Sequence, residues 1–189
     1  MTTLAGIQGK GWCVIGAEAK ASDQSGTFVL MPTPKIFVNN GVLIAGCGSV
    51  RGLNLMEYDF ESPVLNEDVK IESYLTRQFI PAMRKTYVES GSEIRQEGDV
   101  ATMENGLLIG VSGRLFSIGS DYSWDQSAKG LYHYGSGGSY ALGAMTALSA
   151  HKCKTPEEAV EIITIAVKAA IDCDVYSGGK VSTFVQYTP

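Results

Sequence analysis

The chain has 189 residues, which suits one globular domain spanning residues 1–189. Its formal net charge is −5, with 15 Lys and Arg against 20 Asp and Glu, which argues against a nucleic-acid-binding protein because such proteins need a basic face. Hydrophobic residues make up 44% and charged residues 19%, which excludes disorder by composition, and no apolar run is long enough to predict a membrane helix.

Short apolar segments separated by glycine-rich turns predict strands through most of the first half. The expected strands cover residues 3–8, 11–18, 26–31, 35–38 and 42–45. Asn40 and Gly41 lie between the last two of these segments and are typical of a tight hairpin turn. Between residues 66 and 87, apolar side chains recur at helical spacing and predict a helix that Pro81 should kink or end.

The second half is predicted to contain three more strands and two helices. The strands cover 107–111, 115–118 and 181–187, and the helices cover 139–150 and 156–173. The second helix is the best defined, because Thr155 can act as its N-cap, Pro156 suits its first position and Glu158 completes a capping box. Apolar residues nearly encircle it, so we expect burial on several sides. This order of elements favours sheets with helices on their outer faces.

Several common kinds of site are not supported by the residues. The glycine-rich segments 46–52 and 135–139 lack the spacing of a dinucleotide fingerprint and of a P-loop. Four scattered cysteines and two histidines make a zinc site or a histidine-based triad improbable, so the sequence predicts no metal and no cofactor. The start of the chain lacks the pattern of a secretory signal, and with scattered cysteines this favours a cytoplasmic protein.

The second residue offers a different chemistry. Removal of Met1 would leave Thr2 as the first residue, with a hydroxyl nucleophile and a basic α-amine on the same residue. An α-amine has a pKa of about 7.7–8.0, so it can act as a base near neutral pH. Many proteins begin with Met-Thr, so this pair alone carries little weight.

Five further segments occur in a specific order along the chain. They comprise residues 16–20 (Gly-Ala-Glu-Ala-Lys), 34–37 (Pro-Lys-Ile-Phe), 43–46 (Leu-Ile-Ala-Gly), 133–141 (around Gly-Ser-Gly-Gly) and 174–179 (Asp-Val-Tyr-Ser-Gly-Gly). Together with Thr2, this set resembles proteasome β-type subunits and the bacterial peptidase HslV. Residues 112–122 are also similar to proteasome-like proteins of phages and bacteria. Each motif is weak by itself, but the ordered set covers nearly the whole chain.

The resemblance implies an α+β fold, the four-layer αββα sandwich of N-terminal nucleophile hydrolases, with two antiparallel sheets between outer helices. It also implies roles for individual residues. Thr2 would be the nucleophile, with Glu18 and Lys35 beside it; Ser136, Asp174 and Ser177 would orient the amine and a water; and the Gly46 N–H would stabilise the oxyanion. The pocket for the residue before the cut bond would be lined by Ala21, Thr33, Ile44 and Gly48. Its small walls and apolar floor predict a medium or large apolar residue at that position of the substrate.

The resemblance leaves three functions open. The first is a threonine peptidase assembled into a homo-oligomeric ring, with two rings expected to stack in the family's manner. It would cleave peptides, or unfolded proteins that an ATP-dependent unfoldase supplies. The second is an amidohydrolase acting on small amides. The third is a silent scaffold that retains Met1. Taken singly, the same residues also have ordinary structural explanations, such as a surface ion pair for Lys35 and Glu18 or turn positions for the two serines.

Overall fold

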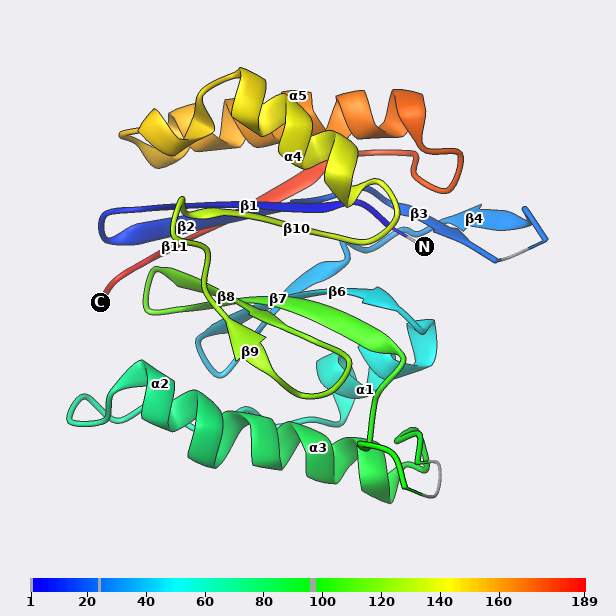
Figure 1. The fold of residues 1–189 in the computed structure, drawn as a ribbon, viewed down its shortest axis with the longest axis vertical. Coiled ribbons are helices and arrows are strands. Elements are labelled where there is room, and N and C mark those ends of the chain that lie inside the picture. The colour runs from blue at the N-terminus through cyan, green and yellow to red at the C-terminus, as the bar shows by residue number, and fades with distance from the viewer. Residues whose placement is uncertain (1, 24, 96–97) are drawn as a thin grey trace.

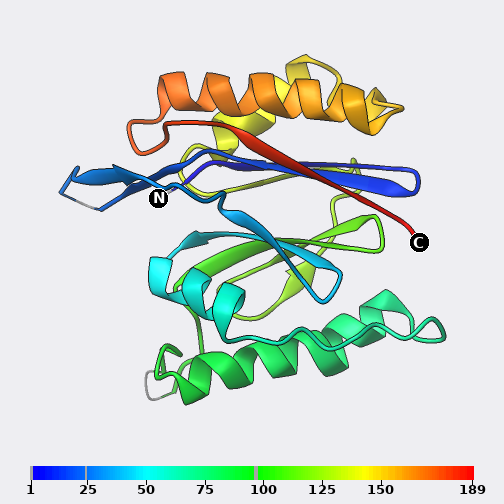
Figure 2. The ribbon, with the colours of Figure 1, turned by 180° about the vertical axis from the view of Figure 1, so that it is seen from behind.

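Four layers make up the molecule (Figures 1 and 2). The computed structural model describes residues 2–23, 25–95 and 98–189. Two sheets pack face to face in the middle; α4 (Gly138–Ala147) and α5 (Pro156–Cys173) cover one of them. The other sheet is covered by α1 (Val50–Tyr58) and by a long helical run ending in α3 (Ile80–Glu89). The expected α+β, four-layer αββα arrangement is therefore confirmed.

Both main sheets are antiparallel throughout. The first has the order β10-β1-β2-β11, formed by Leu131–Tyr134, Leu4–Gly9, Trp12–Ala17 and Ser182–Tyr187. The second has the order β5-β6-β7-β8-β9, formed by Ile36–Asn39, Val42–Gly48, Asn105–Val111, Arg114–Ile118 and Trp124–Asp125. A small third sheet pairs β3 (Lys20–Ser22), which was not predicted, with β4 (Phe28–Leu30), which lies within the expected strand 26–31. It extends from the sandwich beside the N-terminus (Figure 1).

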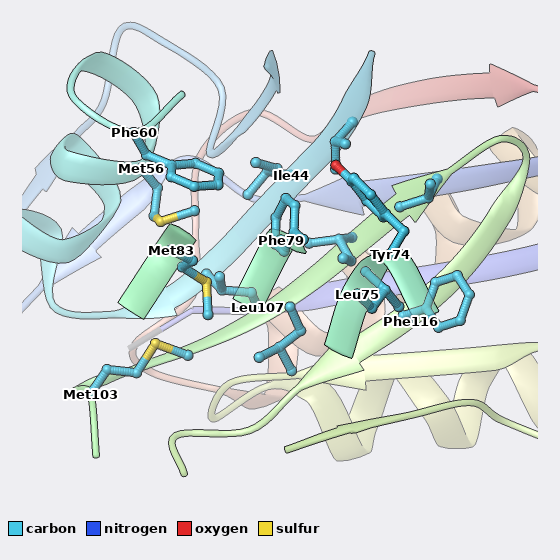
Figure 3. Close-up of a cluster of buried hydrophobic side chains, with 14 of the residues drawn as sticks. Ile44, Met56, Phe60, Tyr74, Leu75, Phe79, Met83, Met103, Leu107 and Phe116 are labelled. Atoms are coloured by element: carbon cyan, nitrogen blue, oxygen red, sulfur yellow. The ribbon is translucent and has the colours of Figure 1, made fainter. Parts of the chain in front are cut away.

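Strand alternation divides the core into three clusters. Side chains between the two sheets form one cluster, and the other two lie between each sheet and its helices. Along β6, Leu43 and Ala45 face the opposite sheet, whereas Ile44 faces the helical layer. Figure 3 shows Ile44 in that layer with Phe79 and Met83. Because neighbouring strand residues point to opposite faces, a shift of one position along the strand moves a side chain from the helical layer to the interface between the sheets.

The long helical run does not end at Pro81. It consists of α2 (Ile71–Tyr74), the π-helical turn η1 (Leu75–Phe79) and α3. The N–H of Ile80 donates to the carbonyl of Leu75, five residues earlier, so the wider turn immediately precedes the proline. Pro81 lacks an N–H and cannot complete an ordinary α-helical turn there. The structure therefore accommodates Pro81 by a π turn, and the run remains helical.

The helix α5 begins and ends at the predicted residues. The Thr155 hydroxyl accepts a hydrogen bond from the N–H of Glu158 at 3.3 Å, as an N-cap does. The expected burial on several sides is only partly seen within the single chain, where Ile165 on this helix is 53% exposed. The apolar residues that face the sheet are buried, and the remaining stripe faces outward. No helix in the described part of the chain is long and apolar enough to cross a bilayer.

Candidate active site

The two sheets bring Thr2, Glu18 and Lys35 together at one end of the sandwich. Thr2 precedes β1, Glu18 follows β2 and Lys35 precedes β5, so both sheets contribute to one buried cluster. The Lys35 ammonium donates to Thr2 Oγ1 at 3.0 Å and forms an ion pair with Glu18 Oε1. Thr2, Glu18 and Lys35 are 4%, 1% and 5% exposed, respectively. A surface ion pair between Lys35 and Glu18 is therefore excluded.

Backbone groups hold the Glu18–Lys35 pair in place. Glu18 Oε2 accepts from the N–H groups of Lys20 at 2.6 Å and Gly178 at 3.0 Å, and Oε1 accepts from the Thr3 N–H at 3.3 Å. Lys35 Nζ also donates to the Lys20 carbonyl at 2.5 Å. An ammonium has three donors, and here they are directed to a hydroxyl, a carboxylate and a carbonyl. Burial lowers the pKa of Lys35, although Glu18 acts in the opposite direction.

Asp174 organises a second polar cluster on the other side of the N-terminal segment. Its Oδ2 accepts from the hydroxyls of Ser136 and Ser177, both at 2.7 Å, and Ser177 Oγ lies 2.7 Å from Thr3 Oγ1. A hydroxyl has one proton, and Ser177 gives its proton to the carboxylate, so Thr3 is the donor to Ser177. The N–H of Gly137 donates to the Thr2 carbonyl at 3.3 Å. These contacts connect Thr2 to the glycine-rich turn at residues 135–138 and Thr3 to the loop that follows α5.

We expect the Asp174 cluster to make stability dependent on acid pH. Burial alone would raise the pKa of Asp174, but hydrogen bonds from Ser177 and Ser136 outweigh it and hold the pKa below its ordinary 3.8. A lowered folded-state pKa adds stability above pH 3.8, which is lost as the pH falls through the folded-state value. The difference in unfolding free energy between the wild type and Asp174→Asn should therefore shrink below about pH 4, as measured by urea unfolding. A difference that stays constant down to pH 2 would contradict this assignment.

A small cavity of about 30 Å³ lies beside Thr2 and Lys35. Two of the four residues expected in the substrate pocket, Ala21 and Gly48, line it, together with residues that were not predicted: Ser22, Met31, Val50 and Leu53. The other two lie elsewhere. Ile44 is fully buried in the cluster under the helical layer, because its position in β6 points it away from the cavity, and Thr33 is exposed and does not line the cavity.

The glycine that lines the cavity together with Thr2 is Gly48, whereas the expected oxyanion residue was Gly46. Gly46 does not line the cavity, and a side chain there would collide with Leu53, since its Cβ would lie 2.2 Å from Leu53 Cδ2. Gly48 pairs with Asn105, and the next residue, Ser49, donates its N–H to the Glu104 carbonyl at 3.4 Å. This register makes Gly48 and Asn105 a non-hydrogen-bonded pair, so the Gly48 N–H points away from β7. On this segment, Gly48 therefore offers the amide for a negatively charged oxygen at the cavity.

Two contributors were missed from the sequence. Thr3 is fully buried and uses its N–H and its hydroxyl to connect the Glu18 and Asp174 clusters. Lys20 contributes its backbone N–H and carbonyl, which no sequence motif reveals because every residue carries them. For Thr3, the only indication in the sequence was a second hydroxyl residue directly after Thr2. In the described part of the chain, no three His, Cys, Asp or Glu side chains gather closely enough to hold a metal ion.

Comparison with known proteins places this arrangement in context. The model of the family described as Proteasome subunit matches residues 1–185. No curated protein sequence matches the chain significantly.

Solved structures with a similar fold cover essentially the whole chain. The Thiobacillus denitrificans protein BPH, in complex with epoxomicin, has a TM-score of 0.78 and 21% identity, with 100% of both chains covered. HslV from Trypanosoma brucei has a TM-score of 0.67 and 20% identity over 98% of this chain and 99% of its own. A Gly-1 mutant of Anbu from Hyphomicrobium sp. strain MC1 has a TM-score of 0.72 and 11% identity, over 99% and 82%.

Proposed function

Because this chain belongs to the proteasome subunit family, we propose that it is a threonine peptidase with Thr2 as its nucleophile. The observation that carries the proposal is the buried hydrogen bond from Lys35 to Thr2 Oγ1 at 3.0 Å. A nearby ammonium favours the deprotonated form of a hydroxyl, and burial strengthens the effect because water is excluded. Met1, whose removal the mechanism requires, lies outside the described residues.

The proposed reaction proceeds through an acyl-enzyme. Thr2 Oγ1 attacks the scissile carbonyl while its proton passes to the freed α-amine, directly or through a water. The carbonyl oxygen becomes negative and receives the Gly48 N–H, a contact of the kind worth about 3–4 kcal/mol of barrier. The amine then protonates the leaving group as the C–N bond breaks. Water attacks the ester by the same proton route, which releases the acid and restores Thr2.

Glu18 and Asp174 have supporting roles in this proposal. Glu18 keeps the Lys35 side chain directed at Thr2, since its two oxygens are fixed by three backbone N–H groups. Asp174 holds the Thr3 hydroxyl through Ser177, and together with Ser136 and Ser177 it would orient the amine and the water. These groups lower the barrier by holding the reacting atoms in position.

Assembly into a homo-oligomeric ring, with two rings stacked, is part of the same proposal. Exposed apolar side chains support it: Phe28, Val29 and Leu30 of β4 are 54–63% exposed, and Ile165 on α5 is 53% exposed. Such side chains are usual at subunit contacts. A chamber would restrict substrates to peptides or unfolded chains, with an ATP-dependent unfoldase supplying the latter. All four cysteines are free thiols, which fits a reducing compartment such as the cytoplasm.

Hydrolysis of small amides is the second candidate. The cavity beside Thr2 has about the volume of a single water molecule, and this favours a small group next to the cut bond. The pocket's largely apolar lining favours an uncharged side chain for either candidate. The sequence-based expectation of a medium or large apolar residue at this position stays a prediction.

Mass spectrometry and a substrate panel test the proposal. We expect the intact mass to lack one methionine, and fluorogenic peptides with Ala, Leu or Phe before the cut bond to be cleaved faster than peptides with Asp. Epoxomicin, present in the Thiobacillus structure, should inhibit the cleavage. Cleavage of simple amides without cleavage of peptides would favour the second candidate. Full retention of Met1 with no turnover would overturn both and leave the silent scaffold.

A further inference from the structure

A buried asparagine lies directly behind the Gly48 segment. Asn105 is the first residue of β7 and is 1% exposed. Its Nδ2 donates to the Cys47 carbonyl at 3.1 Å and to the Ser49 carbonyl at 2.8 Å, the residues immediately before and after Gly48. One side-chain amide thus holds the backbone on both sides of the glycine that lines the cavity at Thr2.

The amide of Asn105 is itself fixed in orientation. Its Oδ1 accepts from the Tyr87 hydroxyl at 3.1 Å, and Tyr87, on α3, is 1% exposed. Carbonyl oxygens can only accept, so the nitrogen of Asn105 must face Cys47 and Ser49 while its oxygen faces the tyrosine. The helical layer is thereby connected to the Gly48 segment through a chain of buried hydrogen bonds.

The glycine in α1 is explained by the same contact. A Cβ on Gly52 would lie 1.8 Å from Asn105 Oδ1, so any side chain at residue 52 would displace the amide. Glycine within a helix costs about 1 kcal/mol relative to alanine. The close approach of Asn105 explains why residue 52 is a glycine despite that cost.

The geometry points to Asn105 as a positioning residue for the oxyanion-binding amide of Gly48, an inference that rests on the proposed function. In a trans peptide, the C=O and the following N–H point in opposite directions. The register of β6 and β7 turns the Cys47 carbonyl to the β7 side, and Asn105 holds it there with a side-chain donor. The N–H of the same peptide unit, that of Gly48, therefore points away from β7. The second bond, to the Ser49 carbonyl, holds the peptide unit between Ser49 and Val50. The unit between Gly48 and Ser49 is held by the Ser49 N–H, which donates to the Glu104 carbonyl at 3.4 Å. Asn105 does not touch the reacting atoms; it sets the direction of the donor that does.

The isosteric substitution Asn105→Asp tests this role. It removes both donors, keeps an acceptor for Tyr87 and places a carboxylate against two carbonyls. We expect kcat for a fluorogenic peptide to fall about 10–100-fold, with KM changed less than about threefold. The reason is that an oxyanion donor stabilises mainly the transition state, so its misdirection raises the barrier more than it weakens substrate binding. Gly52→Ala should lower kcat in the same way, although alanine is the better helix former.

A matched control is available at the other end of α1. Asn39 Nδ2 donates to the carbonyls of Met56 at 3.3 Å and Phe60 at 2.7 Å, and its Oδ1 accepts from the Ser62 N–H at 2.9 Å. Asn39→Asp therefore disrupts an equivalent contact away from Thr2, and should lower the urea midpoint while leaving kcat within about twofold. Equal losses of kcat in the two variants would overturn the inference.

A milder variant covers the case in which Asn105→Asp does not fold. Tyr87→Phe removes one hydroxyl and leaves both donors of Asn105, and we expect a three- to tenfold fall in kcat at constant KM; an unchanged kcat overturns the inference. If the wild type itself cleaves nothing, the proposed function fails separately. Crystal structures of the variants then decide: a displaced backbone at residues 47–49 supports positioning by Asn105, and an unmoved backbone refutes it.

Discussion

Replacing Thr2 with alanine is expected to reduce peptide cleavage roughly 10⁴-fold or more, because loss of a catalytic nucleophile has effects of this size. The side-chain hydroxyl that accepts from Lys35 is lost, so the ammonium loses one of its three acceptors. The unfolding free energy should fall by only about 1–3 kcal/mol, and the fold should remain. Single-turnover and steady-state cleavage of a fluorogenic peptide, with urea unfolding alongside, measure both effects.

Two neighbouring variants make the result specific. Thr2→Ser keeps a hydroxyl beside Lys35 and should retain measurable turnover. Thr3→Val removes the bond to Ser177 and should weaken turnover without abolishing it, because Thr3 does not contact Lys35 through its side chain. If Thr2→Ala cleaves at the wild-type rate, Thr2 is not the nucleophile.

Replacing Lys35 with methionine should have the second largest effect, on both rate and stability. Cleavage should fall by roughly 10³-fold, because the hydroxyl of Thr2 loses its ammonium neighbour. The variant also leaves Glu18 buried without its ion-pair partner, which typically costs about 3–5 kcal/mol. The expected result is therefore an inactive protein with a clearly lowered urea midpoint.

A double variant separates the two consequences. Adding Glu18→Gln to Lys35→Met removes the unpaired buried charge, so much of the stability should return while activity does not. Lys85→Met is the surface control, because the Lys85–Glu89 pair is exposed and 3.7 Å apart, and its loss should change neither property measurably. Recovery of activity in the double variant would exclude Lys35 from the chemistry.

Much of the fold could be predicted because its signals are local. The capping residues of α5 defined its first turn, and Asn40 and Gly41 both have positive φ, as the hairpin between β5 and β6 requires. The short strands β3 and β9 could not be predicted, since strands of two or three residues show no periodicity, whereas β4 lies within the predicted strand 26–31. Pro81 indicated a departure from a regular α-helix, but the sequence did not show that this departure would be a π turn within a continuing helical run.

The choice between Gly46 and Gly48 shows where sequence reasoning about the site stops. The two glycines lie two residues apart on β6, so their N–H groups point in the same direction. They differ in their surroundings: β5 pairs with β6 only as far as Ala45, and the cavity opens beyond that point at Gly48. That difference depends on strand register, which is a long-range property of the fold.

The bond between Thr3 and Ser177 has a consequence for how the protein is made. It joins residues 174 positions apart, and Glu18 similarly accepts from Gly178, 160 positions away. Contacts of such sequence separation form late, since most of the chain must be ordered first. During synthesis, a chain that has not yet emerged past the loop after α5 carries Thr2 and Lys35 but lacks Ser177 and Gly178, which contact Thr3 and Glu18. Under the proposed function, such a nascent chain would lack a complete site, and cleavage would begin only once the loop after α5 has emerged and packed.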